Sequence, residues 1–465
     1  MNFIAHAMTR RGFGGSLHME IPVEEAPALT KDHPLTPRQR RQAIIAATLG
    51  NGLEFYDFIT FAFFAIQIGH TFFPSHSPFL SLMGSLATFF AGFLTRPLGA
   101  FVLGGYADRV GRKPAMMISM TMMGVGIILL VITPGYATIG YAAPVIAVIA
   151  RMIQGFALGG EVGSATIYMM ESADPHRRAF AMSWQGASQN IAASVGSAVG
   201  LLLALVMSDS DLSAYGWRIA MALGVTIVPV ALWVRSSLPE TIHHADAVVI
   251  AHDGFRSYLR PIVCGLIIIG SGTIGTYIFQ YMTTYGQNTL HLSATLSMAG
   301  EFANNAISVV AILVGAAVSD RKGRKHTMLV PQLLFCALIV PCFLWLTTQR
   351  DAVSFIGANL ILSYLSGYMY GAVYAAISES IPKEVRARAF ALIYALPVAI
   401  LGGSTQLIVT WLLEVTQSPM AIAWYLTAVS LIGFAAMVAL KESAPVKLGL
   451  GPLPARPRTR VRRQA

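Results

Sequence analysis

The sequence predicts an all-α integral membrane protein with twelve transmembrane helices in two pseudo-symmetric halves of six. Three observations lead to this fold class: charged residues are scarce, apolar residues gather in twelve long segments, and the two halves share short motifs. Of the 465 residues, 55% are hydrophobic and only 12% are charged, whereas a soluble globular protein carries about twice that share of charge. Water is therefore not the main solvent of this chain.

Each apolar segment is long enough to cross the core of a bilayer as a helix, which takes about 20 residues. The first six segments lie at 42–69, 79–106, 114–133, 143–168, 181–207 and 217–235. The second six lie at 261–285, 294–318, 327–347, 353–378, 389–413 and 420–440. The predicted organisation is a tail at 1–41, a first half at 42–235, a polar loop at 236–260, a second half at 261–440 and a basic tail at 441–465.

The net charge of +10 could suggest a nucleic-acid partner, but its distribution argues against one. If both termini are cytoplasmic, the Lys and Arg residues of the loops lie on the cytoplasmic side, except for Arg350 and for Arg218 at a helix boundary. This asymmetry is the positive-inside pattern of a multi-pass membrane protein. The lipid bilayer is thus the expected partner, with both termini and the central loop in the cytoplasm.

The three cysteines, Cys264, Cys336 and Cys342, all lie within apolar segments. That placement suits small core side chains and offers neither a disulfide scaffold nor a Cys/His zinc site. We therefore expect no metal and no cofactor.

The two halves repeat each other at corresponding places. DRVGRK at 108–113 follows the second span of the first half, and DRKGRK at 320–325 follows the second span of the second half. ESADPHRRAFA at 171–181 and ESIPKEVRARAFA at 379–391 both lie between the fourth and fifth spans of their halves. These matches predict a parallel repeat, an architecture in which transporters hold their substrate between the halves near the membrane midplane.

These motifs resemble those of the major facilitator superfamily, whose loop after the second span reads GxxxDRxGRK, as it does here from Gly104 to Lys113. Within it, the chain resembles the metabolite:proton symporter family through GNGLEFYDF at 50–58, RPLGAFVLGGYADRVGRK at 96–113, QGFALGGEVG at 154–163 and GWRI at 216–219. The resemblance covers about residues 42–440. It implies the superfamily fold, a place in the bacterial cytoplasmic (inner) membrane, and symport with the proton as coupling ion.

Within that family the chain is most similar to the citrate and tricarballylate proton symporters. The similarity rests on SWQGASQN at 183–190, RSSLPET at 235–241 and AILGGSTQLIVTWL at 399–412. It implies uptake of a small organic anion such as citrate or a related di- or tricarboxylate, by a protein that works as a monomer. Symport of 2-oxoglutarate, shikimate, proline or betaine remains an alternative, because relatives with those substrates share the motifs of the family.

Ionised side chains inside the expected spans point to proton coupling. Each costs at least about 2.5 kcal/mol in the bilayer core and therefore needs a partner or a task. The residues concerned are the acids Glu54, Asp57, Glu161 and Glu301 and the arginines Arg96 and Arg151. Because acids outnumber arginines, we predict that these acids carry protons, most of all Asp57 with Glu54 beside it. The alternative is that Glu54 or Asp57 only pairs with an arginine and locks helices together.

The two arginines are also the fixed cations nearest the predicted midplane, and a guanidinium matches a carboxylate in two-point geometry. A structural role for Arg151 and an anchoring role for Arg96 at the inner gate remain alternatives. Polar residues spaced three or four apart share a helix face and complete the expected site. The predicted substrate-binding residues are Asn51, Arg96, Arg151, Gln185, Gln189, Tyr277, Tyr281 and Asn305. The two tyrosines could equally be packing residues.

Glycines spaced by four, such as Gly155 with Gly159 and Gly367 with Gly371, predict faces on which helices approach closely. In an alternating-access carrier such faces slide, and the DRxGRK loops latch the halves through charge contacts with helix ends. The predicted gating residues are Asp108, Arg109, Arg112, Glu171, Asp320, Arg321, Arg324 and Glu379.

Other classes of membrane protein fit less well. An intramembrane enzyme needs a nucleophile with a base or a pair of aspartates, yet no His lies deep in an expected span and Asp57 is the one mid-membrane aspartate. We therefore expect no catalytic site. A channel does not fit duplicated halves that imply alternating access. A nutrient sensor on a transporter scaffold stays open, because a sequence does not reveal turnover.

Overall fold

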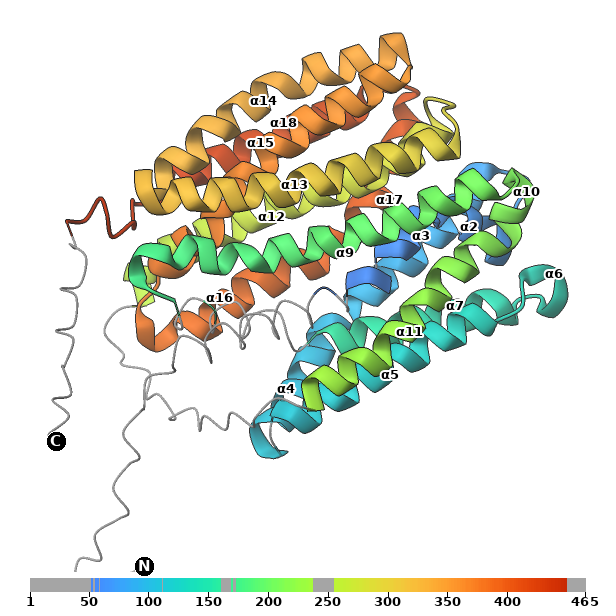
Figure 1. Ribbon diagram of the computed structural model, residues 1–465, viewed down its shortest axis with the longest axis horizontal. Coiled ribbons are helices and arrows are strands. Elements are labelled where there is room, and N and C mark those ends of the chain that lie inside the picture. The colour runs from blue at the N-terminus through green and yellow to red at the C-terminus, as the bar shows by residue number, and fades with distance from the viewer. Residues whose placement is uncertain are drawn as a thin grey trace, which may run out of the picture.

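The computed structural model describes residues 52, 55–57, 59–110, 112–159, 169, 173–236 and 255–449. Every regular element in these ranges is a helix, and Figure 1 shows the helices side by side in one bundle. Helices are expected here because a span in lipid has to satisfy its backbone N–H and C=O groups internally. Eight of the described helices are long and apolar enough to cross a membrane, and shorter apolar helices lie at Met117–Ile132 and Ala142–Leu158.

In the first half the described residues form helices at the expected places, while residues 42–51 of the first expected span and 160–168 of the fourth lie outside the described ranges. The main elements are α2 (Ala65–Phe72), α3 (Pro78–Leu94), α4 (Arg96–Val110), α5 (Arg112–Ile132), α7 (Ala142–Leu158), α9 (Arg178–Val206) and α11 (Trp217–Ser236). Short turns lie between them, at α6 (Tyr136–Ile139), η1 (Pro175–Arg177), α10 (Asp209–Asp211) and η2 (Leu212–Gly216). The span expected at 79–106 divides at Thr95 into α3 and α4. Pro97 explains the division, because it has no N–H to donate to the preceding turn.

The second half follows the same order. Its helices are α12 (Phe255–Asn288), α13 (Ala294–Lys322), α14 (Arg324–Gln349), α15 (Ala352–Glu379), α16 (Lys383–Pro397), α17 (Gly403–Thr416) and α18 (Ala421–Ala439). The π-helical turn η3 (Val398–Gly402) follows Pro397 and interrupts the span expected at 389–413. Gly323 alone joins α13 to α14, with a φ of 106° that favours glycine.

Equivalent helix pairs in the two halves pack with their backbones in close contact. A Cβ atom on Gly155 of α7 would lie 1.7 Å from the carbonyl oxygen of Gly92 in α3. A Cβ atom on Gly315 of α13 would lie 2.0 Å from the carbonyl oxygen of Tyr368 in α15. Both contacts join the second and fourth spans of their half, so the packing repeats as the sequence does. The all-α fold with two related halves is confirmed.

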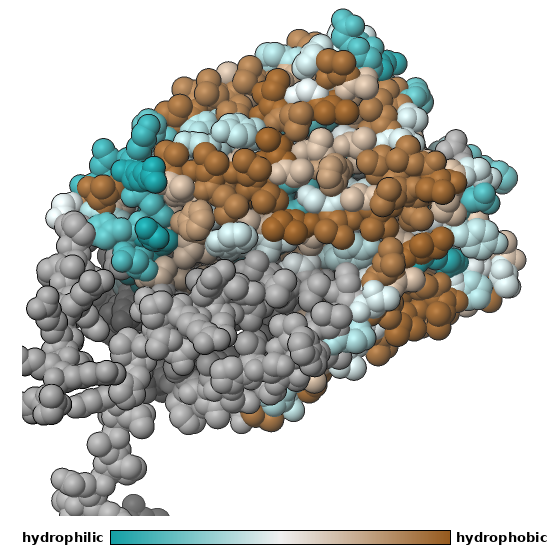
Figure 2. All heavy atoms as spheres, viewed as in Figure 1, coloured by the Kyte–Doolittle hydropathy of each residue, from teal (hydrophilic) through white to brown (hydrophobic). Residues whose placement is uncertain are grey.

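The two halves meet mainly through α9, which contacts α13 and α15, and through α3, which contacts α17 and η3. α9 runs beside α13 (Figure 1), and α3 packs against α17. Where α3 meets α17, Gly403 allows a close approach, because a Cβ atom there would lie 2.6 Å from the ring of Phe90 and 3.0 Å from its Cα atom. Figure 2 shows hydrophobic residues over the flank of the bundle and hydrophilic residues toward its ends, as expected for a protein surrounded by lipid.

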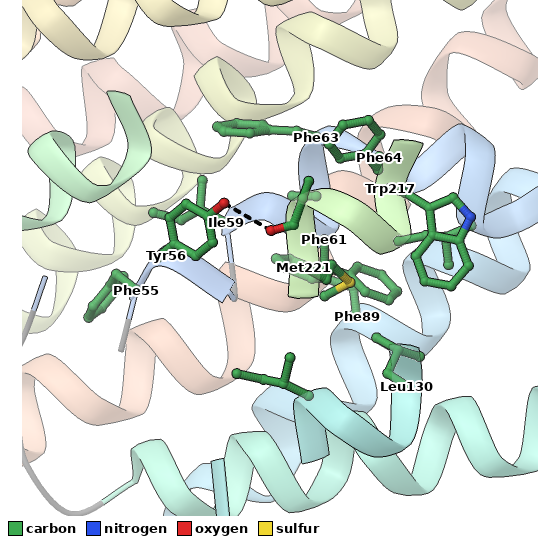
Figure 3. Packing of buried hydrophobic residues seen from close by; sticks show 14 of the residues in the cluster. Phe55, Tyr56, Ile59, Phe61, Phe63, Phe64, Phe89, Leu130, Trp217 and Met221 are labelled. Atoms are coloured by element: carbon green, nitrogen blue, oxygen red, sulfur yellow. Dashed lines mark hydrogen bonds between the residues drawn. The ribbon is translucent and has the colours of Figure 1, made fainter. Parts of the chain in front are cut away.

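An aromatic core in the first half fixes the helix that carries Asp57. Figure 3 shows Phe55, Tyr56 and Phe61 among the buried side chains of this cluster. The hydroxyl group of Tyr56 donates to the carbonyl oxygen of Ala220 in α11 at 2.9 Å. The first span is thereby tied to the sixth, which holds Asp57 in a defined place.

Candidate functional site

A cavity lies between the two halves. It is lined by the first span and by residues of α9, α12, α13, α15, α16 and η3. The lining residues are Phe55, Ile59, Ser183, Gly186, Gln189, Asn190, Ala193, Ile269, Thr273, Thr276, Tyr277, Phe279, Gln280, Asn304, Asn305, Ser308, Ile312, Ser363, Ser366, Gly367, Tyr370, Tyr374, Tyr394 and Val398. None of these described residues is charged. The wall therefore offers hydroxyl and amide groups to a small solute, and any fixed charge acts from behind it.

A buried ion pair in the first half provides such charge. Nη1 of Arg151 donates to Oδ2 of Asp57 at 3.2 Å and also to Oε1 of Gln154. The guanidinium group lies over the ring of Phe61, 4.4 Å from its centroid, and 5.7 Å from that of Phe89. The side chains of Arg151 and Asp57 are 0% and 2% exposed. Removing either partner would leave an uncompensated charge in a dry interior.

Arg96 brings a second cation close to the cavity. Its guanidinium carbon lies 4.0 Å from the ring centroid of Phe93. The side chain interacts electrostatically with Tyr277 and Tyr394. Both tyrosines line the cavity, and the hydroxyl group of Tyr394 accepts a hydrogen bond from Nε2 of Gln189 at 3.4 Å. The charge of Arg96 thus acts on the cavity through tyrosine hydroxyl groups.

The second half holds a carboxyl group among amides. Glu301 is 1% exposed, and its Oε1 accepts hydrogen bonds from Nδ2 of Asn305 at 3.0 Å and of Asn304 at 3.4 Å. Within the described residues its Oε2 has no hydrogen-bond partner. Oδ1 of Asn304 accepts a hydrogen bond from the hydroxyl group of Ser363. Because both asparagines and Ser363 line the cavity, the amides link Glu301 to the cavity wall.

At the end of the bundle predicted to face the cytoplasm, Arg324 contacts two carboxylates. Its Nη1 lies 2.7 Å from Asp320, and its Nε and Nη2 lie 3.1 and 3.0 Å from the two oxygens of Glu379. Asp320 also accepts backbone N–H groups from Ala179 and Phe180, in the first turn of α9, at 3.1 and 3.0 Å. A carboxylate is favourable at a helix N-terminus. This contact joins α13 of the second half to α9 of the first.

Glu442, which follows α18, completes the cluster at this end. Its carboxylate accepts backbone N–H groups from Arg324, Lys325, Ser443 and Ala444. Partial burial opposes ionisation, but these donors outweigh it and hold the pKa of Glu442 below its ordinary value. The hydroxyl group of Ser443 donates to Glu379 at 3.0 Å. The segment after the last span is thus fastened to the turn between α13 and α14.

The structure brings part of the predicted substrate site to the cavity. Gln189, Tyr277 and Asn305 line it. Gln185 and Tyr281 are buried but do not belong to the described lining. The hydroxyl group of Tyr281 instead accepts a hydrogen bond from Thr410 at 2.9 Å.

Several predicted site residues lie outside the described residues: Asn51, Glu54, Glu161 and Glu171. For Asp108, Arg109 and Arg112 only the backbone is described, at the end of α4 and the start of α5. Arg321 lies in α13 with an exposed side chain. The roles assigned to these residues stay predictions.

Some residues of the site were missed by sequence reasoning. Gln154 and Asn304 follow Arg151 and Glu301 by three residues, so the helical spacing could have found them. Tyr370, Tyr374 and Tyr394 carry no such signal, since tyrosines in spans are also packing residues. Glu442 lies in a stretch that the composition assigns to a tail.

The chain is similar to known membrane transporters over most of its length. Residues 47–397 match the Major Facilitator Superfamily. The chain is 37% identical over 405 residues to a citrate-proton symporter of Salmonella typhi, covering 86% of this chain and 93% of that one. It is 32% identical over 419 residues to the alpha-ketoglutarate permease of Escherichia coli (strain K12), covering 87% and 95%. A solved D-xylose-proton symporter superposes with a TM-score of 0.71 at 17% identity, covering 88% and 99%, which supports the fold alone.

Proposed function

The chain belongs to the Major Facilitator Superfamily, as its motifs indicated, and on that premise we propose that it takes up citrate, or a related di- or tricarboxylate, together with protons. The observation that carries this proposal is the position of Arg96, whose charge acts on Tyr277 and Tyr394 in the wall of a cavity between the two halves. The 37% identity to a citrate-proton symporter supports the same substrate class. Transport proceeds by alternating access of this cavity to the two sides of the membrane.

Arg96 supplies the positive charge that an organic anion needs. In a cavity shielded from water, a cation at the wall attracts a carboxylate far more strongly than in solution. The hydroxyl groups of Tyr277 and Tyr394 and the amide group of Gln189 donate hydrogen bonds to the carboxylates of the substrate.

Asp57 and Arg151 couple the substrate to the proton. A proton on Asp57 neutralises the carboxylate and leaves the charge of Arg151 to be compensated. An anion in the adjacent cavity offers that compensation, so the proton and the anion favour each other's binding. Release of the proton restores the ion pair and expels the anion. In this scheme the proton is the coupling ion.

The transporter works as a monomer in the bacterial cytoplasmic (inner) membrane, with both termini in the cytoplasm. The distribution of basic loop residues supports this orientation. In this orientation, the contact between Asp320 and the first turn of α9 holds the two halves together at the cytoplasmic end. Opening toward the cytoplasm then requires Asp320 to leave α9.

One observation favours a second candidate, symport of a zwitterionic osmolyte such as proline or betaine. The described lining of the cavity carries no charged side chain, which suits a solute without net charge. The position of Arg96 favours the anion, because its charge acts on two tyrosines of the cavity wall and would attract a substrate carboxylate there.

Uptake into proteoliposomes tests the proposal. The purified chain is given labelled citrate, tricarballylate, 2-oxoglutarate, shikimate, proline or betaine, with and without an inward proton gradient. Gradient-driven accumulation of citrate, abolished by an uncoupler, is the expected result. Accumulation of proline or betaine alone would support the second candidate. Binding of citrate without any uptake would indicate a sensor and contradict transport.

A further inference from the structure

Asn304 and Asn305 stand between a buried acid and the cavity. We propose that these two residues form an amide switch, whose N–H donors serve either Glu301 or a carboxylate of the substrate. A proton on Glu301 releases the donors to the cavity, so that proton and substrate bind together. The inference rests on the proposed function and adds to it a second proton site, in the half of the protein that lacks the ion pair of Asp57.

The acid end of the switch is a carboxyl group that no cation neutralises in the described part of the chain. The groups that act on Glu301 are the amides of Asn304 and Asn305 on its own helix, and no charged or titratable side chain of the described neighbouring helices contributes. Its Oε2 has no described hydrogen-bond partner. An ionised carboxylate is costly in this setting, and Oε2 is therefore a suitable place for a proton to add.

The orientation of Asn304 makes the switch directional. The hydroxyl group of Ser363, from α15, donates to Oδ1 of Asn304. A hydroxyl donor on the amide oxygen leaves the NH₂ group to face Glu301, where Nδ2 lies 3.4 Å from Oε1. Asn305 uses its NH₂ group for the backbone oxygen of Glu301 at 2.9 Å and for Oε1 at 3.0 Å.

Protonation of Glu301 weakens the hydrogen bonds that it accepts from the two asparagine amides. Hydrogen bonds to a charged acceptor are roughly twice as strong as those to a neutral one. When a proton adds to Oε2, the carboxyl group becomes neutral and holds the two amides less firmly. Since Asn304, Asn305 and Ser363 all line the cavity, a substrate carboxylate can then take the donors. By linkage, a bound substrate raises the affinity of Glu301 for the proton by the same factor.

The test measures citrate affinity of the purified full-length chain by titration calorimetry. The pH is varied over a range in which the ionisation of citrate itself is constant. For the wild type, affinity should fall about tenfold as Glu301 loses its proton, which is within the usual range of coupled sites. Glu301→Gln mimics the protonated group, so it should keep the high affinity and remove this part of the pH dependence.

The amides are tested by Asn304→Leu and Asn305→Leu, singly and together. The double variant should bind citrate more weakly and show the reduced pH dependence of Glu301→Gln, and adding Glu301→Gln to it should change nothing further. Asn359→Leu is the matched control. Asn359 is a buried amide in α15 that donates to Phe355 of its own helix at 2.8 Å and lies outside the described lining. Its variant should keep the wild-type profile.

Opposite results would overturn the switch. An unchanged pH profile in Glu301→Gln, or in the double variant, contradicts it while leaving the proposed function intact if the wild type still binds and accumulates citrate. A wild type that neither binds nor transports citrate refutes the proposed function instead, and the switch with it. If the leucine variants do not purify as folded protein, Asn304→Ser and Asn305→Ser replace them, and Glu301→Gln still decides.

Discussion

Arg151 and Arg324 are both almost completely buried, yet their surroundings differ. Their side chains are 0% and 1% exposed. Arg324 uses all three guanidinium nitrogens, with Nε and Nη2 on one carboxylate and Nη1 on another. Arg151 contacts Asp57 through Nη1 at 3.2 Å, and the same nitrogen donates to Gln154.

The difference indicates two roles: the ion pairs of Arg324 form a permanent structural lock, whereas the ion pair of Arg151 with Asp57 is exchangeable and opens during transport. A two-point contact fixes the geometry of Arg324 and adds to its strength, as suits a residue that holds a closed end together. Arg151 contacts Asp57 through one nitrogen and packs on the ring of Phe61, so this contact can open when Asp57 takes up a proton. Equal burial of two arginines therefore does not imply equal function.

Arg151→Lys should have the largest effect and sharpens this distinction. Lysine keeps the charge but has no planar group that could lie flat on the ring of Phe61, as the guanidinium group of Arg151 does. We expect the rate of citrate uptake in proteoliposomes to fall about 100-fold, equivalent to roughly 3 kcal/mol. The amount of inserted protein is compared by immunoblot. The same substitution at Arg324 should mainly lower thermal stability, and near-normal uptake by Arg151→Lys would contradict the exchangeable pair.

Asp57→Asn tests the proton on the other side of the pair. The amide mimics a permanently protonated carboxyl group, so the carrier should still exchange citrate across the membrane, because exchange never requires the proton to leave. It should not accumulate citrate against a gradient. Counterflow and proton-driven uptake are measured side by side on the same vesicles. Normal gradient-driven accumulation by the variant would show that coupling lies elsewhere, with Glu301 as the leading candidate.

Most of the fold follows from the sequence, because the bilayer permits little else. Runs of apolar residues long enough to cross lipid have to be helices, and the duplicated motifs place them in two halves. The interruptions at Thr95 and at η3 were not predicted. A proline signals a possible break, but hydropathy does not say whether neighbouring helices will compensate for the missing N–H.

Less of the site could be predicted, for a geometric reason. Spacing along a helix tells which side chains share a face, as with Glu301 and Asn305, but not which face meets the cavity. Gln185 and Gln189 share a face in this sense, yet only Gln189 belongs to the described lining. The rotation of each helix is set by packing between halves, for instance by the glycine at position 403 against Phe90, and a single sequence does not contain that information.

Asp320→Asn tests the lock at the cytoplasmic end and should have a moderate effect. The carboxylate caps the first turn of α9, and losing its charge at a helix N-terminus costs about 1 kcal/mol. We expect a lower unfolding temperature and faster labelling of a cysteine introduced at Ser183, which lines the cavity, from the cytoplasmic side of inverted vesicles. Lys322→Gln is the matched control, since the exposed Lys322 lies two residues after Asp320 and is not among the predicted gating residues. Equal labelling rates in both variants would show that the contact between Asp320 and α9 does not hold the halves together.

Glu442→Gln should give the smallest effect and shows how far the lock extends beyond the last span. The N–H donors at the start of α14 hold the pKa of Glu442 below its ordinary value of 4.5. A carboxyl group whose pKa is lowered by folding stabilises the fold at pH values above its ordinary pKa. This contribution disappears as the pH falls through the lowered pKa. Because the group is partly exposed, solvent screening keeps the contribution below about 1 kcal/mol. Thermal unfolding of the wild type and the variant should therefore differ slightly at neutral pH and converge on acidification. A difference that persists unchanged in acid would show that Glu442 acts through packing rather than through its charge. The segment after α18 would then not belong to the ion-pair cluster of Arg324, Asp320 and Glu379.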